Sequence, residues 1–111
     1  MKNKLKNAID IYYEAFMSNN PELLTTVLIE EVYLRDWEIE KQGITDVIET
    51  SSQIMKLPNF GIEILNEIYE GEFAVVDIIV KVNEETLKVI DLFEFENYKI
   101  KSIKMLCNLN K

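Results

Sequence analysis

Histidine is absent from the 111 residues, and cysteine occurs once, at Cys107. Without histidine the usual zinc and iron ligand sets cannot be assembled, and a single cysteine excludes an intrachain disulfide. Cys107 also lacks a histidine that could act as its base, so nucleophilic catalysis by this thiol is not expected. A magnesium site made of carboxylates stays open, although no spacing points to one. We therefore expect no metal and no cofactor.

Basic residues are few and are not clustered. The chain has 12 Lys and Arg against 20 Asp and Glu, a formal net charge of -8. Nucleic acids and anionic membrane surfaces are bound through basic patches, so neither is an expected partner. The N-terminal segment is charged and then amphipathic, and no apolar run has the length of a signal peptide or a membrane span. We expect a cytoplasmic protein with a single domain over residues 1–111.

The first half of the chain has the period of amphipathic helices. Apolar residues recur at helical spacing in its first stretch, at Leu5, Ala8, Ile9, Tyr12, Phe16 and Met17. The segment from Ser18 to Pro21 predicts the end of this helix and the start of a second, which buries Leu28 and ends near Glu30. Residues 32–39 are then predicted as a strand. A third helix is predicted after Gly43 and ends at residues 57–59.

The second half of the chain alternates apolar and polar residues, which is the period of strands. Four strands are predicted, over residues 60–69, 73–82, 86–96 and 99–109. Their connections are short enough for antiparallel hairpins, so the four strands should form a meander. Helices followed by such a sheet predict an α+β domain, in which the helices cover one face of the sheet. A curved sheet that is covered by helices can enclose a pocket.

One residue of the strand over residues 86–96 breaks the pattern of its neighbours. Alternate residues of a strand face the same side, so Asp91 lies in a row with Leu87, Val89, Phe93 and Phe95. A carboxylate in an apolar row is costly unless it is protonated, paired or hydrogen-bonded, and such groups often mark functional sites. Asp91 is therefore the first candidate for a site residue.

The other face of the same strand carries Ile90 and Leu92. Apolar side chains on the outer face of a sheet indicate that another surface covers them. A second copy of the chain is the simplest candidate, so we expect a homodimer that forms through the sheet.

Several stretches resemble one known superfamily. They are YYEAFMSNNPELLTTVLIEEVYLRD, then the helix opened by Gly43 and Ile44, then VIDLFEFENYKIKSIKML. Together they are similar to the nuclear-transport-factor-2-like superfamily, in particular to its ketosteroid isomerase and SnoaL-like polyketide cyclase branch. The resemblance implies a cone-shaped, curved antiparallel sheet with the N-terminal helices on its concave face and a pocket between them. That scaffold carries enzymes as well as non-catalytic binding modules.

The resemblance also implies roles for three residues. The catalytic tyrosine of the isomerase falls on Tyr12, or on Tyr13 if the register slips by one. The general base falls on Asp36, and the protonated aspartate of the oxyanion hole falls on Asp91. The implied reaction moves a proton next to a carbonyl group. The walls of the substrate pocket are then expected from Phe16, Leu34, Val89, Phe93 and Phe95.

Other readings of these residues stay open. Tyr12 can be a core tyrosine, Asp36 can end a strand or cap a turn, and Asp91 can be structural. Arg35 precedes Asp36 and could pair with it, and Trp37 stands where the isomerases commonly have proline. The competing function is a non-catalytic module that holds a small apolar ligand or a protein partner. An enzyme requires a tyrosine hydroxyl and the Asp91 carboxyl to converge in an open cavity that Asp36 also faces.

Overall fold

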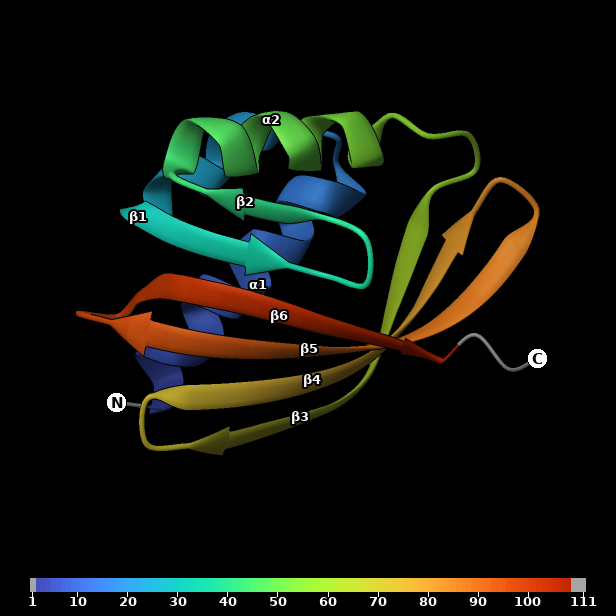
Figure 1. Cartoon of the computed structure of the whole chain (residues 1–111). Coiled ribbons are helices and arrows are strands. Elements are labelled where there is room, and N and C mark those ends of the chain that lie inside the picture. The colour runs from blue at the N-terminus through green and yellow to red at the C-terminus, as the bar shows by residue number, and fades with distance from the viewer. Residues whose placement is uncertain (1, 109–111) are drawn as a thin grey trace.

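The computed structural model describes residues 2–108 of the chain, in nine elements (Figure 1). The helical elements are α1 (Lys2–Met17), the 3-10 helix η1 (Pro21–Thr26) and α2 (Ile44–Met55). The strands are β1 (Leu28–Arg35), β2 (Glu40–Gln42), β3 (Gly61–Glu70), β4 (Phe73–Val82), β5 (Glu85–Glu96) and β6 (Lys99–Asn108). Leu109, which was predicted as the end of the last strand, lies outside the described residues.

All six strands belong to one sheet in the order β2-β1-β6-β5-β4-β3. The four strands β3 to β6 pair antiparallel in sequence order, which confirms the predicted meander. The sheet as a whole is mixed, because β1 pairs parallel with β6. The expectation of a purely antiparallel sheet is thus corrected. A hairpin forces two strands to run antiparallel, but no hairpin joins β1 to β6, and α2 and four strands separate them in the chain.

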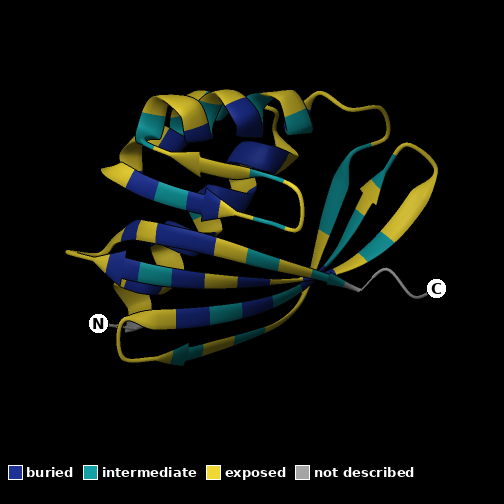
Figure 2. Ribbon diagram, in the orientation of Figure 1, coloured by how far each residue is buried: buried dark blue, intermediate teal, exposed yellow. Residues whose placement is uncertain are grey.

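The two α-helices cover one face of the sheet, and the sheet curves around them (Figure 1). In the same view, β3, β4 and β5 bend along their length, so that one end of each strand turns up beside the loop that follows α2. The buried residues lie where the strands face the helices (Figure 2). This arrangement confirms the predicted α+β fold with helices on the concave face.

Helix α1 packs through an aromatic cluster on β5. The Tyr12 ring lies edge-on to Phe93, with 5.2 Å between the ring centroids, and 5.0 Å from the Phe16 ring. Such aromatic pairs add to the stability gained by burying their area. The predicted stripe of the helix is buried up to Phe16. Met17 was expected on it as well but is 54% exposed, because the helix ends at this residue.

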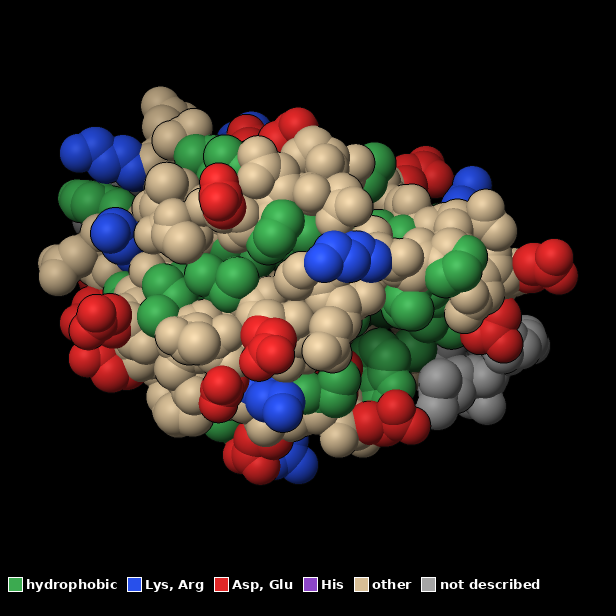
Figure 3. Space-filling view, turned by 90° about the horizontal axis from the view of Figure 1, so that it is seen from above, with side chains coloured by type: hydrophobic (Ala, Val, Ile, Leu, Met, Phe, Trp, Pro, Cys, Tyr) green, Lys and Arg blue, Asp and Glu red, His purple; other side chains and the backbone are tan. Residues whose placement is uncertain are grey.

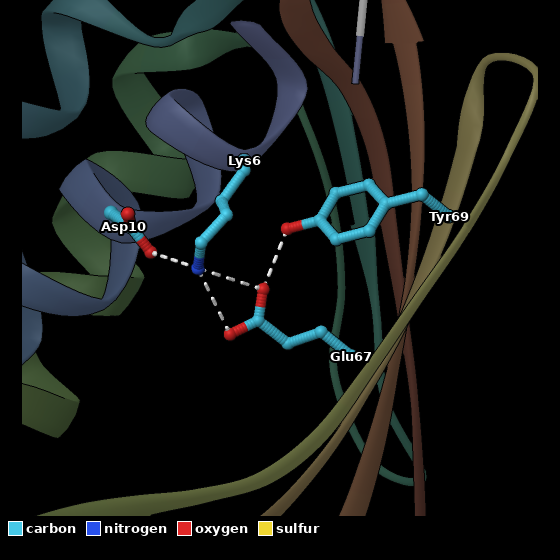
Figure 4. A network of polar contacts seen from close by, with 4 residues as sticks. All are labelled: Lys6, Asp10, Glu67 and Tyr69. Atoms are coloured by element: carbon cyan, nitrogen blue, oxygen red, sulfur yellow. Dashed lines mark hydrogen bonds and ion pairs between the residues drawn. The ribbon is translucent and has the colours of Figure 1, made fainter. Parts of the chain in front are cut away.

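A polar cluster holds the first turns of α1 against β3 (Figure 4). The Lys6 ammonium lies 3.4 Å from Asp10 Oδ1 and 3.4 Å from Glu67 Oε1. The Tyr69 hydroxyl donates to Glu67 Oε1 over 2.7 Å. The Lys6 and Asp10 side chains are about half exposed, so the ion pairs orient the helix more than they stabilise it.

The second predicted helix is wrong in type and length. Residues Pro21–Thr26 form a short 3-10 helix, in which the Thr25 and Thr26 hydroxyls donate to carbonyls three residues earlier. Leu28 is the first residue of β1 and not part of a helix. The Ile100 N–H donates to the Val27 carbonyl over 2.7 Å, so β6 draws this segment into the sheet. Such tertiary pairing overrides local helical spacing.

The strand predicted over residues 32–39 instead ends at Arg35, and the remaining elements follow the sequence pattern closely. Helix α2 covers the predicted third helix, and β3 to β6 begin within one residue of their predicted starts. The three-residue strand β2 was not predicted, since it is too short and too charged to show a period. On β5 the row with Asp91 faces inward, while Ile90 and Leu92 are exposed, as expected. Among the described residues, no helix has the length and apolar character needed to cross a membrane.

Candidate functional site

A cavity of about 280 Å³ lies between α1, the curved part of the sheet and the chain that links β1 to β2. Helix α1 contributes Tyr12, Tyr13 and Phe16, and the β1–β2 connection contributes Asp36, Trp37, Glu38 and Ile39. Most of the remaining wall is aliphatic and comes from β4 and β5 and from the segment around the end of α2. Viewed from above, hydrophobic side chains gather in a hollow toward the end of the molecule where the strands turn up (Figure 3). The pocket expected from a curved sheet is therefore present and open.

Asp91 lies in this cavity with almost no exposure to solvent. Its side chain is 2% exposed, and its neighbours across the sheet are Val76 on β4 and Met105 on β6. The Tyr13 hydroxyl donates to Asp91 Oδ2 over 2.5 Å. Oδ1 is buried and has no hydrogen-bond partner among the residues that the structure describes. An unpaired buried carboxylate oxygen is costly, so this atom is the most unusual polar group of the site.

Burial raises the pKa of the Asp91 carboxyl to about 7, although the hydrogen bond from Tyr13 opposes the shift. Desolvation disfavours the charged form of a carboxyl group, while a donor to the carboxylate favours it. Desolvation, together with the nearby Asp91 carboxylate, also raises the pKa values of Tyr12 and Tyr13. Near neutral pH a large share of molecules therefore carries a proton on Asp91. In that state the carboxyl group can donate a hydrogen bond as well as accept one.

The structure separates the two tyrosines on α1 that the sequence left as alternatives. Both line the cavity and both are buried, but only Tyr13 bonds to Asp91. The Tyr12 ring packs edge-on against the Tyr13 ring, with 5.1 Å between their centroids. The Tyr12 hydroxyl has no hydrogen bond to another described residue. Tyr13 is thus the hydrogen-bond partner of the Asp91 carboxyl group. Tyr12 lines the same cavity, and its hydroxyl is available to a ligand.

Asp36 stands at the mouth of the cavity, directly after the last residue of β1. Its Oδ1 accepts hydrogen bonds from the N–H groups of Glu38, at 2.7 Å, and Ile39, at 2.5 Å. This turn orients the carboxylate through one oxygen only. Arg35 does not pair with Asp36, because its guanidinium lies 3.6 Å from Glu40 instead.

The expected walls of the pocket are only partly in place. Phe16 and Val89 line the cavity, whereas Leu34, Phe93 and Phe95 are buried in the core and do not line it. The apolar residues of the wall that were not named from the sequence are Ile54, Leu57, Phe60, Ile62, Ile78, Val80, Val82, Leu87 and Met105. The alternation of apolar residues along β4 places Ile78 and Val80 on the face that carries Ala74 and Val76, so these two could be found from the sequence. The residues around the end of α2 could not be found this way, because they reach the cavity only through the tertiary fold.

No group of three or more Asp, Glu, Cys or His side chains within the described part of the chain could hold a metal ion. The polar atoms of the cavity are instead the hydroxyl and carboxyl groups of Tyr12, Tyr13, Asp36, Glu38 and Asp91, and the Trp37 indole. What this set can do chemically is hydrogen bonding and proton transfer.

Solved structures share this fold at low sequence identity. A nuclear-transport-factor-2-like protein of unknown function from Mesorhizobium loti superimposes with a TM-score of 0.88, at 12% identity, over 96% of this chain and 92% of that one. A proposed ketosteroid isomerase from Kribbella flavida gives a TM-score of 0.86, at 12% identity, over 98% of this chain and 81% of that one. A proposed SnoaL-like polyketide cyclase from Jannaschia and an LEH-like epoxide hydrolase from M. tuberculosis also share the fold. The chain therefore has the nuclear-transport-factor-2-like fold, as the resemblance predicted.

Sequence comparisons add little to the structural ones. No protein-family model matches the chain. Among curated proteins, the ATP synthase subunit alpha of Caldanaerobacter subterraneus subsp. tengcongensis is 29% identical over 83 residues, which are 75% of this chain. The chain spans only 16% of the length of that subunit, and its name describes the whole subunit.

Proposed function

We propose that the cavity binds a small apolar carbonyl compound and that the protein moves a proton next to the carbonyl group. The observation that carries this proposal is the buried Asp91 carboxyl, which lines an open, largely apolar cavity and has one oxygen without a hydrogen-bond partner among the described residues. A ligand with a carbonyl oxygen would accept a hydrogen bond from neutral Asp91 and so satisfy that atom. An enzyme of this kind requires a tyrosine hydroxyl next to the Asp91 carboxyl. Tyr13, the alternative to Tyr12, makes this contact.

The proposed reaction assigns one task to each polar group. Oδ1 of neutral Asp91 donates to the ligand carbonyl, while Tyr13 holds Oδ2. Asp36 removes a proton from the carbon next to the carbonyl, which leaves an enolate whose oxygen Asp91 stabilises. Asp36 then returns the proton to another carbon of the same ligand, so the double bond moves and nothing else is consumed. The Tyr12 hydroxyl is a second donor candidate for the enolate oxygen.

The names of two structural neighbours support the same class of reaction. One is a proposed ketosteroid isomerase and the other a proposed SnoaL-like polyketide cyclase. Their similarity to this chain lies in the fold, so the assignment depends on the site geometry given above.

The test uses cyclohex-3-enone, whose double bond moves into conjugation when a proton is shifted. The protein is expected to accelerate formation of cyclohex-2-enone by at least about 100-fold over buffer, the usual contribution of a positioned acid or base. Proton NMR follows both compounds directly. No acceleration for this enone or for a larger steroidal enone would overturn the proposal.

A non-catalytic ligand-binding protein is the second candidate, and one observation favours it. Oδ1 of Asp36 already accepts two backbone hydrogen bonds, so only Oδ2 is left to act as a base. In this case the enone would bind, with chemical-shift changes at Tyr13 and Asp91, but its double bond would not move.

We further propose that a second copy of the chain covers the outer face of the sheet. Val75, Ile90, Leu92 and Leu106 lie side by side there on β4, β5 and β6, and Leu106 is 72% exposed. Lysines and acidic residues border this patch, Lys88 and Lys104 with Asp77 and Glu94. Both signs of charge occur on the same face, so a two-fold-related copy can place them opposite one another.

Leu106→Glu is expected to convert a dimer into a monomer in sedimentation experiments at micromolar concentration. A buried charge on both sides of a two-fold contact would repel its equivalent. Gln53→Glu is the control, since it adds a negative charge at an exposed position of α2, on the other side of the sheet. A wild-type protein that sediments as a monomer would contradict the proposed dimer.

A further inference from the structure

The mouth of the cavity is acidic, and no basic side chain lines the cavity. Asp36 and Glu38 are acidic residues at the mouth, Asp91 inside is neutral in the proposed function, and no lining residue is Lys or Arg. Arg35, the nearest basic residue in sequence, pairs with Glu40 outside the cavity. The whole chain has a formal charge of -8. A carboxylate or phosphate group that enters this cavity would meet like charges and no cation.

Inside the mouth, the polar anchor is a single small group. Asp91 Oδ1 is the one buried polar side-chain atom without a partner among the described residues, and Tyr13 occupies the other carboxyl oxygen. The wall around it is built of aliphatic and aromatic side chains such as Phe16, Ile78 and Val89. Apart from Asp91, only the Tyr12 hydroxyl could pair with a polar group at this depth, so a ligand with several polar groups would leave some of them unpaired, which is costly.

The volume of the cavity limits the size of its occupant. About 280 Å³ is the space of roughly nine water molecules, and it lies just below the range of about 300–1,000 Å³ typical of pockets for drug-sized ligands. One ring or a short chain fits this space. A four-ring molecule would have to project through the mouth, past Asp36 and Trp37.

We infer that the natural ligand is an uncharged carbonyl compound of one ring or a short chain, and that the acidic mouth excludes carboxylates and phosphates. This inference rests on the proposed function and adds the size and the charge of the ligand. A cationic amine is the main rival, since it could donate to Oδ1. Its charge would have to be buried among apolar side chains, and the desolvation of an ion pair offsets much of the attraction.

Trp37 offers a direct readout, because it is the only tryptophan of the chain and lines the cavity. Its indole N–H signal would be followed by NMR in titrations with four probes: cyclohexanone, cyclohexanecarboxylate, cyclohexylammonium and a four-ring steroidal ketone. Cyclohexanone is expected to bind, and cyclohexanecarboxylate to bind on the order of 100-fold more weakly. Tighter binding of the carboxylate or of the ammonium than of cyclohexanone would overturn the inference on charge. Tighter binding of the steroidal ketone would overturn the inference on size.

Two charge-reversal variants distinguish the effect of charge at the mouth of the cavity from the effect of the net charge of the protein. Glu38→Lys is expected to strengthen binding of cyclohexanecarboxylate by at least about tenfold, because it places a cation where the ligand enters. Glu30→Lys changes the net charge equally but is exposed on β1 and does not line the cavity. An equal gain in both variants would show a general charge effect and overturn the role of the mouth.

The inference and the proposed function fail in different ways. If cyclohexanone binds as expected but cyclohex-3-enone is not isomerised, the ligand class stands and the catalytic proposal fails. If only a steroidal enone is isomerised, the catalytic proposal stands and the inferred size is wrong.

Discussion

Asp91→Asn is expected to make the protein more stable at pH 9, on the order of 4 kcal/mol, and to change its stability little at pH 3. The pKa of Asp91 is raised from 3.8 to about 7 in the folded protein, mainly by burial. Each unit between the folded and unfolded values corresponds to about 1.4 kcal/mol, which leads to the expected size. Asparagine has nearly the same shape but cannot ionise, so the variant avoids the cost of a buried charge.

The sign of the pH dependence follows from proton binding. Between pH 4 and pH 7 the folded protein keeps the Asp91 proton while the unfolded chain has lost it. Raising the pH through this window therefore favours the unfolded chain, and the loss is complete above about pH 7. Urea unfolding of wild type and variant at pH 3, 6 and 9 measures the difference directly.

Two variants control this experiment. Asp77→Asn makes the same chemical change on the opposite face of the sheet, in a partly buried residue. The stability difference between this variant and wild type is not expected to increase with pH. Tyr13→Phe removes the hydrogen bond that holds the pKa of Asp91 down, so the window should extend to higher pH. A stability difference between wild type and Asp91→Asn that is the same at every pH would show that Asp91 is not held neutral.

Asp36→Asn is expected to slow the isomerisation of cyclohex-3-enone by about 10²- to 10⁴-fold, the usual contribution of a general base. The asparagine Oδ1 can still accept from the N–H groups of Glu38 and Ile39, so the turn at the mouth should persist. The amide cannot take a proton from the ligand. Affinity for cyclohexanone should stay within about twofold, because the ligand is anchored at Asp91.

Glu40→Gln is the matched control for this variant. Glu40 is an exposed acidic residue of the same hairpin, but it pairs with Arg35 and does not line the cavity. Loss of ligand binding without loss of rate would contradict the role of Asp36 as the base. An equal loss of rate in both variants would point to a disturbed hairpin rather than to a missing base.

The candidate site could be predicted from the sequence only in part. Asp91 was found from the alternation of one strand, because a charged residue in an apolar row is visible without any tertiary information. The choice between Tyr12 and Tyr13 could not be made in the same way. Neighbouring residues of a helix point about 100° apart, and both rings can face a cavity if the helix lies across it. Leu34, Phe93 and Phe95 were expected in the pocket wall but lie in the core. An apolar pattern predicts that a residue is buried, and it does not show whether that residue faces the core or a cavity.

Local periodicity by itself determined α1, α2, the meander from β3 to β6 and the inward face that carries Asp91, since each of these depends on residues close in the chain. Only the tertiary structure decided that β1 begins at Leu28 and runs parallel to β6, because that pairing joins segments far apart in sequence. It also decided that Tyr13 bonds to Asp91 and that the space beside them stays open. The side chains around that space come from both helices and from several strands, so its size depends on how these elements pack and not on any one segment.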